Sequence, residues 1–176
     1  VDKKNEKWKN NIESEITHAN KLVLNLLQLA KMDAGEAGEK NLERVELAEE
    51  IKKRIEIFQP KFDGKIKFEN KTRESEKLLP KQDILQVLDI VGDNATKYGD
   101  KKINIELEQG TITISNDGSV VPKADTEKIF DRFYQTDKTR EGSGLGLAIA
   151  KAICEQNKWA ISCQSEKKMT KFKIIF

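Results

Sequence analysis

The sequence predicts an α+β protein, a two-layer α/β sandwich preceded by one long α-helix. Two kinds of periodicity support this fold class. Apolar residues near the start of the chain recur with a helical period, whereas several later segments alternate apolar and polar residues as strands do. Helical segments with one apolar face lie between those strands, and such helices can cover one face of a sheet.

The first helix is expected from Trp8 to Lys31. Its apolar positions step by 4, 3, 4, 3 and 4 residues, which is the heptad seam of a helix that packs against partner helices. The seam consists of Ile12, Ile16, Ala19, Val23, Leu26 and Ala30. Further leucines widen this stripe and favour a four-helix bundle: Leu22, Leu27 and Leu29. The alternative is an ordinary amphipathic helix that lies on its own domain.

A linker is expected after this helix, because Gly35 and Gly38 stand among small and charged residues between Asp33 and Lys40. We therefore divide the chain into residues 1–38, one helix with its linker, and residues 39–176, the main domain.

The main domain is expected to alternate short strands and helices. Strands are predicted at Leu42–Leu47, Ile66–Asn70, Lys77–Leu79, around Ile103–Leu107 and Ile112–Ile114, at Ala160–Ser165 and at Lys171–Phe176. Helices are predicted at Ala48–Gln59 before Pro60, at Pro80–Tyr98, at Asp125–Tyr134 and at Leu145–Gln156. The Pro80 helix should bury Leu85, Leu88, Val91 and Ala95. Gln109-Gly110 should join two strands as a hairpin.

The composition restricts the possible partners. The 32 basic and 30 acidic residues leave a net charge of +2, so we expect no nucleic-acid partner. No apolar run approaches the ~18 residues of a membrane span, so we expect no membrane contact by this part of the protein. The lysine-rich start at Val1 lacks a signal peptide and suggests a cut fragment of a larger parent. Cys154 and Cys163 lack metal-site spacing, and we expect both to be reduced, cytosolic and structural.

The glycine-rich run Gly142–Leu147 enters a predicted helix. Glycines let backbone amides approach an anion, and a helix N-terminus supplies positive potential, so this run is a candidate phosphate cradle. It lacks the Lys-Ser/Thr of a P-loop and the preceding strand of a Rossmann unit. The alternative is a simple turn before a helix.

A second candidate site lies on the Pro80 helix, where Asn94, Lys97 and Tyr98 share one face at spacings i, i+3 and i+4. An amide oxygen can help to hold Mg²⁺ together with substrate phosphates, a lysine can neutralise those phosphates, and an aromatic ring offers a surface to a base. The alternative is a solvated helix end.

A third candidate follows the Ile112–Ile114 strand, where Asn116-Asp117-Gly118 forms a turn. Such a turn can present a side-chain acceptor to an adenine amino group, and Gly118 permits close approach. The alternative is a plain turn without a ligand.

Together these motifs resemble, in order and spacing, the ATP-binding domain of sensor histidine kinases and the wider set of ATPases with the Bergerat nucleotide fold. Asp93–Tyr98 is similar to the family's N box, Asn116–Pro122 to its first glycine box, Ile129–Tyr134 to its F box, and Gly142–Leu147 to its second glycine box. Val45–Glu49 resembles the entry into this domain. The Trp8–Lys31 helix resembles the second helix of the stalk through which these kinases dimerise.

The resemblance implies roles for individual residues. Asn94 would ligate Mg²⁺, and Lys97 would meet the phosphates of ATP. Tyr98, Asn116, Gly118 and Thr170 would lie at or near the adenine. The stretch from Phe133 to Gly142 would be a flexible lid over the nucleotide. The other residues implied to contact ATP are Lys138, Arg140, Gly142, Gly144, Leu145, Gly146 and Leu147.

Four positions depart from the family pattern. Asn116 replaces an aspartate that is usual in the family, and Ile90 replaces a further asparagine that is common. Val120 replaces the second glycine of the first glycine box, and Gln135 replaces a frequent arginine of the lid. These departures suggest weaker nucleotide binding or a more apolar pocket edge.

The resemblance implies a histidine kinase that transfers the γ-phosphoryl group of Mg-ATP to a stalk histidine. The phosphoryl group would pass on to the receiver domain of a response regulator. The single histidine, His18, has no acidic residue after it and lies in the apparent second stalk helix, so we assign it no catalytic role and expect the acceptor to be absent from this fragment. The parent would be a homodimer and a membrane-anchored sensor, with this part in the cytoplasm.

Two rivals remain. One is a non-catalytic module of the same fold that binds ATP or a partner protein. The departures at Asn116, Ile90 and Val120 favour it, whereas Asn94, Lys97 and the glycines of the second glycine box oppose it. The other is a serine kinase of the anti-sigma type, against which the stalk helix argues.

Overall fold

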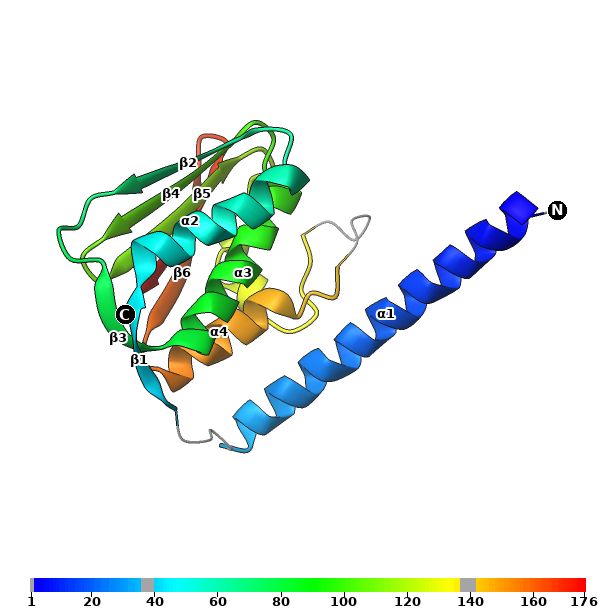
Figure 1. The fold of residues 1–176 in the computed structure, drawn as a ribbon, viewed down its shortest axis with the longest axis horizontal. Helices are drawn as coiled ribbons and strands as arrows, with labels where there is room; N and C mark the ends of the chain where they lie inside the picture. Colours follow the sequence, from blue (N-terminus) through cyan, green and yellow to red (C-terminus); the bar gives the residue numbers. More distant parts are fainter. Residues whose placement is uncertain (1, 36–39, 137–141) are drawn as a thin grey trace.

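The computed structural model describes residues 2–35, 40–136 and 142–176 (Figure 1). A long helix, α1 (Asp2–Asp33), precedes a domain built from the following elements in chain order. They are β1 (Leu42–Glu46), α2 (Leu47–Phe58), η1 (Gln59–Lys61), β2 (Lys65–Asn70), β3 (Glu76–Pro80), α3 (Lys81–Tyr98), β4 (Lys102–Glu108), β5 (Thr111–Asp117), η2 (Lys123–Asp125), η3 (Lys128–Phe130), α4 (Gly146–Gln156), β6 (Ala160–Glu166) and β7 (Met169–Ile175).

Five strands form the main sheet in the order β2-β4-β5-β7-β6, and β1 pairs with β3 in a separate two-stranded sheet. Only the β2–β4 pair is parallel among the pairs of the main sheet. Helices α2, α3 and α4 cover one face of this sheet (Figure 1). The predicted two-layer sandwich is therefore confirmed, as is the hairpin at Gln109-Gly110, where Gly110 has a φ of 68°.

The core lies between the sheet and the helices. Alternate residues of β4 and β5 are buried, as their pattern predicts, and Ile105 pairs with Ile114 across the hairpin. On α3, Leu88, Val91 and Ala95 are buried as predicted, whereas Leu85 is only partly buried. Ile84 and Val87 are fully buried as well. Burial of each large aliphatic side chain contributes about 1.5–3 kcal/mol. This packing fixes the opposite face of α3, which carries the candidate site residues.

The F-box region differs from the prediction of a helix over Asp125–Tyr134. It contains two separate 3₁₀ turns, η2 and η3. Ile129 and Phe130 are buried, and the chain then becomes extended at Asp131, with a ψ of 149°. A single 3₁₀ turn is enough to bury this one apolar pair, so the longer helix that was predicted does not form. Helix α2 also ends one residue earlier than predicted, and Pro60 lies within η1.

Helix α1 has two apolar faces with different surroundings. Leu29 is only 2% exposed, and Leu22 and Met32 pack against the core of the domain. The heptad seam faces solvent instead, since Ile16 is 56% and Val23 63% exposed. The C-terminal part of α1 thus lies on its own domain, as the alternative interpretation held, while the seam remains available.

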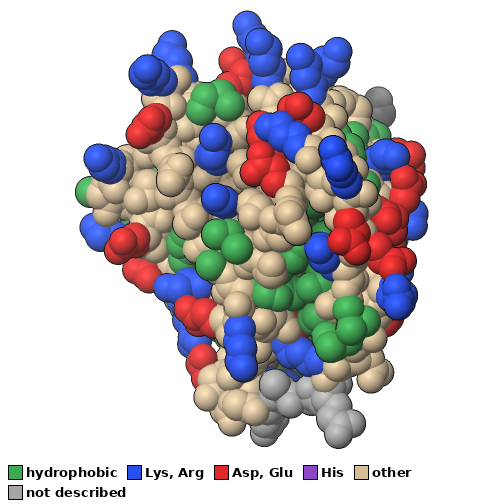
Figure 2. Space-filling view, turned by 90° about the vertical axis from the view of Figure 1, so that its left-hand side faces the viewer, with side chains coloured by type: hydrophobic (Ala, Val, Ile, Leu, Met, Phe, Trp, Pro, Cys, Tyr) green, Lys and Arg blue, Asp and Glu red, His purple; other side chains and the backbone are tan. Residues whose placement is uncertain are grey.

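Charges of both signs are interspersed over the face shown in Figure 2, consistent with the near-zero net charge. Within the described ranges, no helix is both long and apolar enough to cross a membrane. Cys154 and Cys163 are free and buried, and burial raises the pKa of Cys154 to about 12 and that of Cys163 to about 11. Both thiols are therefore protonated and poorly reactive at neutral pH.

Candidate functional site

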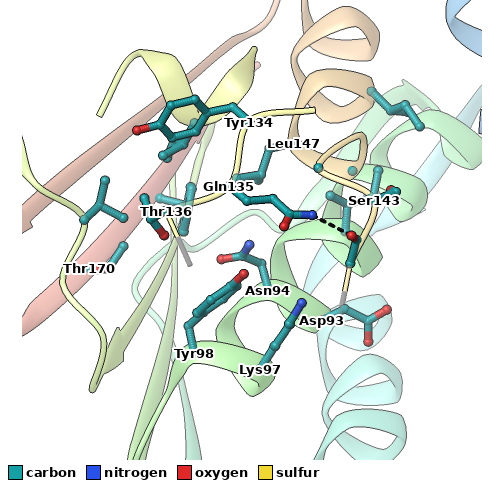
Figure 3. A pocket seen from close by; sticks show the side chains of 18 of the residues that line it. Asp93, Asn94, Lys97, Tyr98, Tyr134, Gln135, Thr136, Ser143, Leu147 and Thr170 are labelled. Atoms are coloured by element: carbon teal, nitrogen blue, oxygen red, sulfur yellow. Dashed lines mark hydrogen bonds between the residues drawn. The ribbon is translucent and has the colours of Figure 1, made fainter. Parts of the chain in front are cut away.

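A cavity of about 560 Å³ lies beside the polar face of α3. Strands β5 and β7 close one end, which we call the buried end, through Asn116, Thr170 and Phe172. Residues 134–136, 142–144, 146 and 147 form the wall opposite α3 (Figure 3). Residues of α1 border the other end, which we call the open end.

Asn116 is the principal polar group of the buried end. Its side chain is almost fully enclosed, since the residue is 1% exposed. The amide nitrogen Nδ2 donates to the Asp117 carbonyl oxygen at 3.0 Å, whereas Oδ1 is buried and has no hydrogen-bond partner among the described residues. An unpaired buried acceptor is costly unless a ligand supplies a donor. The orientation of this amide therefore provides a hydrogen-bond acceptor for a ligand.

Thr170 lies beside Asn116 because the two residues are register partners on β7 and β5. It is 3% exposed, and its hydroxyl donates to the Ser119 carbonyl oxygen at 3.1 Å. This hydrogen bond ties the loop after β5 to the sheet. It keeps Ser119 and the neighbouring Val120 on the edge of the cavity.

Asp117 fixes the turn that follows Asn116. Its Oδ1 accepts from the backbone amides of Asp100, Lys101 and Lys102 at 3.2, 2.9 and 2.8 Å. Burial alone raises the pKa of Asp117, but these backbone donors outweigh it and hold the pKa below its ordinary value. The carboxylate therefore has a structural role and is not available to a ligand.

Gly118 also has a packing role. Its φ is 108°, and a Cβ there would lie 2.5 Å from the Tyr98 carbonyl oxygen. Glycine thus lets the turn pack against the end of α3, and Ser119 N donates to that same oxygen at 3.1 Å. Gly118 does not border the cavity, whereas the sequence predicted that it faces a base.

Asn94, Lys97 and Tyr98 all point from α3 into the cavity, as their spacing predicts (Figure 3). The Lys97 ammonium lies 5.3 Å from the centroid of the Tyr98 ring, a cation–π distance. An amide, a cation and an aromatic surface therefore meet on one helix face.

The opposite wall approaches Lys97 closely. Gln135 donates through Nε2 to the Gly142 carbonyl oxygen (Figure 3). A Cβ on Gly142 would lie 2.8 Å from Lys97 Nζ, so the absence of a side chain there leaves room for the ammonium. Gln135 and Gly142 thus bound the space above Asn94 and Lys97.

Gly144 anchors this wall to the segment before it. Its φ is 68°, and a Cβ would lie 2.7 Å from the backbone carbon of Phe133. Phe133 N donates to the Gly144 carbonyl oxygen at 3.0 Å. Phe133 itself has a φ of 63°, and its exposed side chain does not border the cavity.

Helix α4 begins at Gly146, on the cavity wall. Its first backbone amides and the positive end of its dipole provide a site for an anion. Leu145 is fully buried and anchors this helix start without bordering the cavity. Ile90 lies against the same point, since a Cβ on Gly146 would be 3.5 Å from its Cγ2.

The structure brings most of the predicted site residues together. Those that border the cavity are Asn94, Lys97, Tyr98, Asn116, Gly142, Gly144, Gly146, Leu147 and Thr170. Gly118, Phe133 and Leu145 support its walls from behind. Lys138 and Arg140 lie outside the described residues, as does the side chain of His18.

Several lining residues were not predicted from the sequence. Lys21, Leu22 and Asn25 come from α1, and Asp89 and Asp93 from α3. Their only sequence signal is helical spacing: 22 and 25 share a stripe with Leu29, and 89 and 93 precede the N-box asparagine by five and one residues. Helical spacing alone does not indicate that α1 contacts α3, because this contact depends on how α1 docks on the domain.

Asp89 has an unusual electrostatic environment. Burial raises its pKa, and the neighbouring Asp93 raises it further, while Arg54 opposes both. Arg54 Nε lies 3.2 Å from Asp89 Oδ1. The net upward shift of this pKa comes mainly from burial, and the charge of Asp93 adds to it.

The described residues contain no group of three His, Cys, Asp or Glu side chains that could hold a metal ion. A metal here would therefore need oxygen atoms from a ligand as well as from the protein. Asn94 offers one such oxygen, and this pattern suits Mg²⁺, which is commonly shared between a protein and bound phosphates.

The cavity thus combines an unpaired acceptor at its buried end, a lysine in its middle and a helix N-terminus on its wall, which suits a ligand with both a hydrogen-bond donor and anionic groups. The chain belongs to the family of histidine kinase-, DNA gyrase B- and HSP90-like ATPases, whose sequence pattern matches residues 80–176. The match includes α3, β5 and the start of α4, which carry the predicted boxes.

Individual relatives extend the likeness to α1. The signal transduction histidine-protein kinase ArlS of Staphylococcus aureus is 36% identical over 176 residues, which cover 92% of this chain and 38% of ArlS. The chain thus spans about two fifths of the length of this relative.

Solved structures share the fold. Full-length ShkA in complex with AMPPNP matches with a TM-score of 0.86 at 21% identity, over 96% of this chain and 38% of ShkA. The histidine kinase AdeS of Acinetobacter baumannii matches with a TM-score of 0.76 at 22% identity, over 94% of this chain and 81% of AdeS. ThkA in complex with the response regulator protein TrrA matches with a TM-score of 0.71 at 24% identity, over 96% and 49% of the two chains.

Proposed function

We propose that the cavity binds ATP, with the adenine at the buried end and the phosphates toward Lys97 and the start of α4. The observation that carries this proposal is the unpaired Oδ1 of Asn116, an acceptor for the adenine amino group. Guanine carries a carbonyl oxygen at the corresponding position and would oppose two acceptors, so this orientation favours adenine. The ShkA complex contains the ATP analogue AMPPNP on the same fold.

Mg²⁺ is the metal that the site suits. Asn94 would hold it through its amide oxygen, jointly with the phosphates, and the bound metal would supply charge stabilisation for phosphoryl transfer. Lys97, which borders the cavity beside Asn94, would neutralise phosphate charge. The α4 amides would bind phosphate oxygens, as helix N-termini do.

The reaction we infer is transfer of the γ-phosphoryl group to a histidine, followed by relay to an aspartate of a response regulator. The homology to ArlS and the complex of ThkA with TrrA support this relay. His18 is followed by Ala19 and Asn20, so no acidic residue next to it can accept a proton. The acceptor we propose is therefore a histidine of another helix, outside these 176 residues.

In this proposal residues 1–38 are a stalk helix with its linker, and residues 39–176 are the catalytic domain. The exposed seam of α1, including Ile16 and Val23, would pack in the dimeric bundle of the parent protein. The parent would be a sensor kinase whose catalytic part lies in the cytoplasm.

The test is a calorimetric titration with a non-hydrolysable ATP analogue, with and without Mg²⁺. We expect Mg²⁺ to increase the affinity of the wild-type chain and not that of Asn94→Ala. Asn41→Ala is the matched control, because Asn41 is exposed and does not border the cavity. Equal affinities of all three proteins would contradict the role of Asn94.

A second candidate function is a non-catalytic module that binds ATP or a partner protein. Ile90 and Val120 favour it, because both border the cavity with apolar groups where the family commonly has an asparagine and a glycine. Incubation with radiolabelled ATP and a supplied stalk that carries the histidine separates the two. Acid-labile label on that stalk indicates a kinase, acid-stable label a serine kinase, and no label the module.

A further inference from the structure

The C-terminal part of α1 is attached to the domain at several points. Gln28 and Gln86 exchange hydrogen bonds at 3.1 Å through their side-chain amides. Arg132 Nη2 donates to both carboxylate oxygens of Asp33 at 2.7 Å. Leu29 is buried between these polar contacts. Such a combination of an apolar anchor and a charge-assisted pair specifies one docked position.

This docking brings one polar stripe of α1 to the cavity. Lys21, Leu22 and Asn25 border it together with Gln86 and Asp93 of α3. Gln86 lies 12 residues before Tyr98, so the cavity follows α3 for about 18 Å from the buried end to α1. The α1 residues border the cavity on the side away from the main sheet (Figure 1), where we place the last phosphates of a nucleotide.

Few basic side chains among the described residues border this cavity. Asp89 and Asp93 border it, and each has a basic neighbour that does not: Arg54 lies 3.2 Å from Asp89, and Lys61 lies 3.6 Å from Asp93. Lys97 and Lys21 are the two basic side chains that border the cavity in the described parts of the chain. Lys21 is exposed and makes no ion pair with another described residue, so its ammonium is available to a ligand.

We propose that Lys21 of α1 is a phosphate-binding residue, so that the nucleotide site is complete only when α1 is docked. This inference rests on the proposed binding of ATP and adds a residue from outside the ATPase family match, which begins at residue 80. Binding of a polyphosphate and docking of α1 must then stabilise each other by the same factor.

The experiment compares the affinities of the full chain for ATP and adenosine by calorimetry. Lys21→Ala is expected to lower the affinity for ATP about threefold to tenfold. The affinity for adenosine should not change, because adenosine has no phosphate. Lys31→Ala is the matched control on the same helix, since Lys31 is exposed and does not border the cavity. It should bind both ligands as the wild type does.

A second variant tests the docking without a change in the cavity. Asp33→Asn removes the charge that Arg132 contacts, and Asp33 does not border the cavity. Asp33→Asn should lower the affinity for ATP by a similar factor. The double variant with Lys21→Ala should bind ATP no more weakly than the weaker of the two single variants. In hydrogen exchange, ATP should protect the amides of residues 21–33 in the wild type and not in Lys21→Ala.

The outcomes separate this inference from the proposed function. If the wild-type chain binds ATP and Lys21→Ala binds it equally well, the role of Lys21 is contradicted and the ATP site stands. Additive effects of the two substitutions would contradict the coupling to docking. If the wild-type chain binds no ATP, both proposals fail.

Discussion

The two ends of the cavity are built differently. At the buried end, Asn116 and Thr170 are held by the register of β5 and β7 and are almost inaccessible to solvent. Toward the open end, Lys97 in the middle of the cavity and Lys21 at its α1 border are long, exposed side chains on helices, and their positions depend on how α3, α1 and the opposite wall pack. The sheet thus provides a preorganised recognition group, while the helices provide adjustable charge. A ligand's base and its phosphates should therefore respond separately to substitution.

The largest expected effect comes from the buried end. Asn116→Leu keeps the side-chain size and removes the acceptor, so a bound adenine would lose its partner at a buried position. We expect the affinities for ATP and for adenosine to fall together, by about tenfold to a hundredfold. Calorimetry of both ligands measures this. A loss confined to ATP would show that Asn116 does not face the base.

In the middle of the cavity, at Lys97, the effect should be smaller and specific to phosphate. Lys97→Ala is expected to lower the affinity for ATP about threefold to tenfold and to reduce the salt dependence of ATP binding. The affinity for adenosine should not change. Lys173→Ala, an exposed lysine of β7 away from the cavity, is the control. An equal loss of adenosine affinity would instead indicate that Lys97 mainly supports the Tyr98 ring.

The support of the buried end can be tested through stability. Asp117→Asn removes the charge that accepts three backbone amides, and we expect a loss of about 1–2 kcal/mol at pH 7 in urea unfolding. The depressed folded-state pKa of Asp117 means that its charge stabilises the fold above the unfolded value of about 3.9. That contribution is lost as the pH falls through the folded-state pKa.

The difference between wild type and Asp117→Asn should therefore be constant between pH 5 and 7 and should shrink toward pH 3. A difference that grows on acidification would contradict the sign of this linkage.

The smallest effect is expected at Thr170. Thr170→Val keeps the shape and removes the hydrogen bond to Ser119, so the loop after β5 should loosen at a cost of about 1 kcal/mol. Adenosine affinity should change by less than about threefold. A loss as large as that of Asn116→Leu would mean that Thr170, and not Asn116, is the main contact of the base.

The sequence predicted the buried end well because strand alternation and turn chemistry are local. Ile112 and Ile114 identified β5, but this strand continues to Asp117, so Asn116 lies within it and not in the predicted turn. The role of Gly118 was missed, because its close neighbour is the Tyr98 carbonyl at the end of another element. A glycine with a positive φ can serve a ligand or a packing contact, and its own sequence does not distinguish them.

The rest of the cavity was only partly predictable. The i, i+3, i+4 spacing correctly placed Asn94, Lys97 and Tyr98 on one face. The heptad seam drew attention to the exposed face of α1, whereas the stripe through Leu22 and Leu29 docks on the domain. Tertiary packing decides which of two apolar stripes a helix buries against its own domain. The position of Lys21 at the cavity could therefore be recognised only in the structure.

The most direct test of the central claim is a crystal structure of the chain with a non-hydrolysable ATP analogue and Mg²⁺. The account predicts the adenine amino nitrogen about 3 Å from Asn116 Oδ1 and the phosphates between Lys97 and the start of α4. A base bound elsewhere, with Asn116 Oδ1 still unpaired or paired to water, would contradict it.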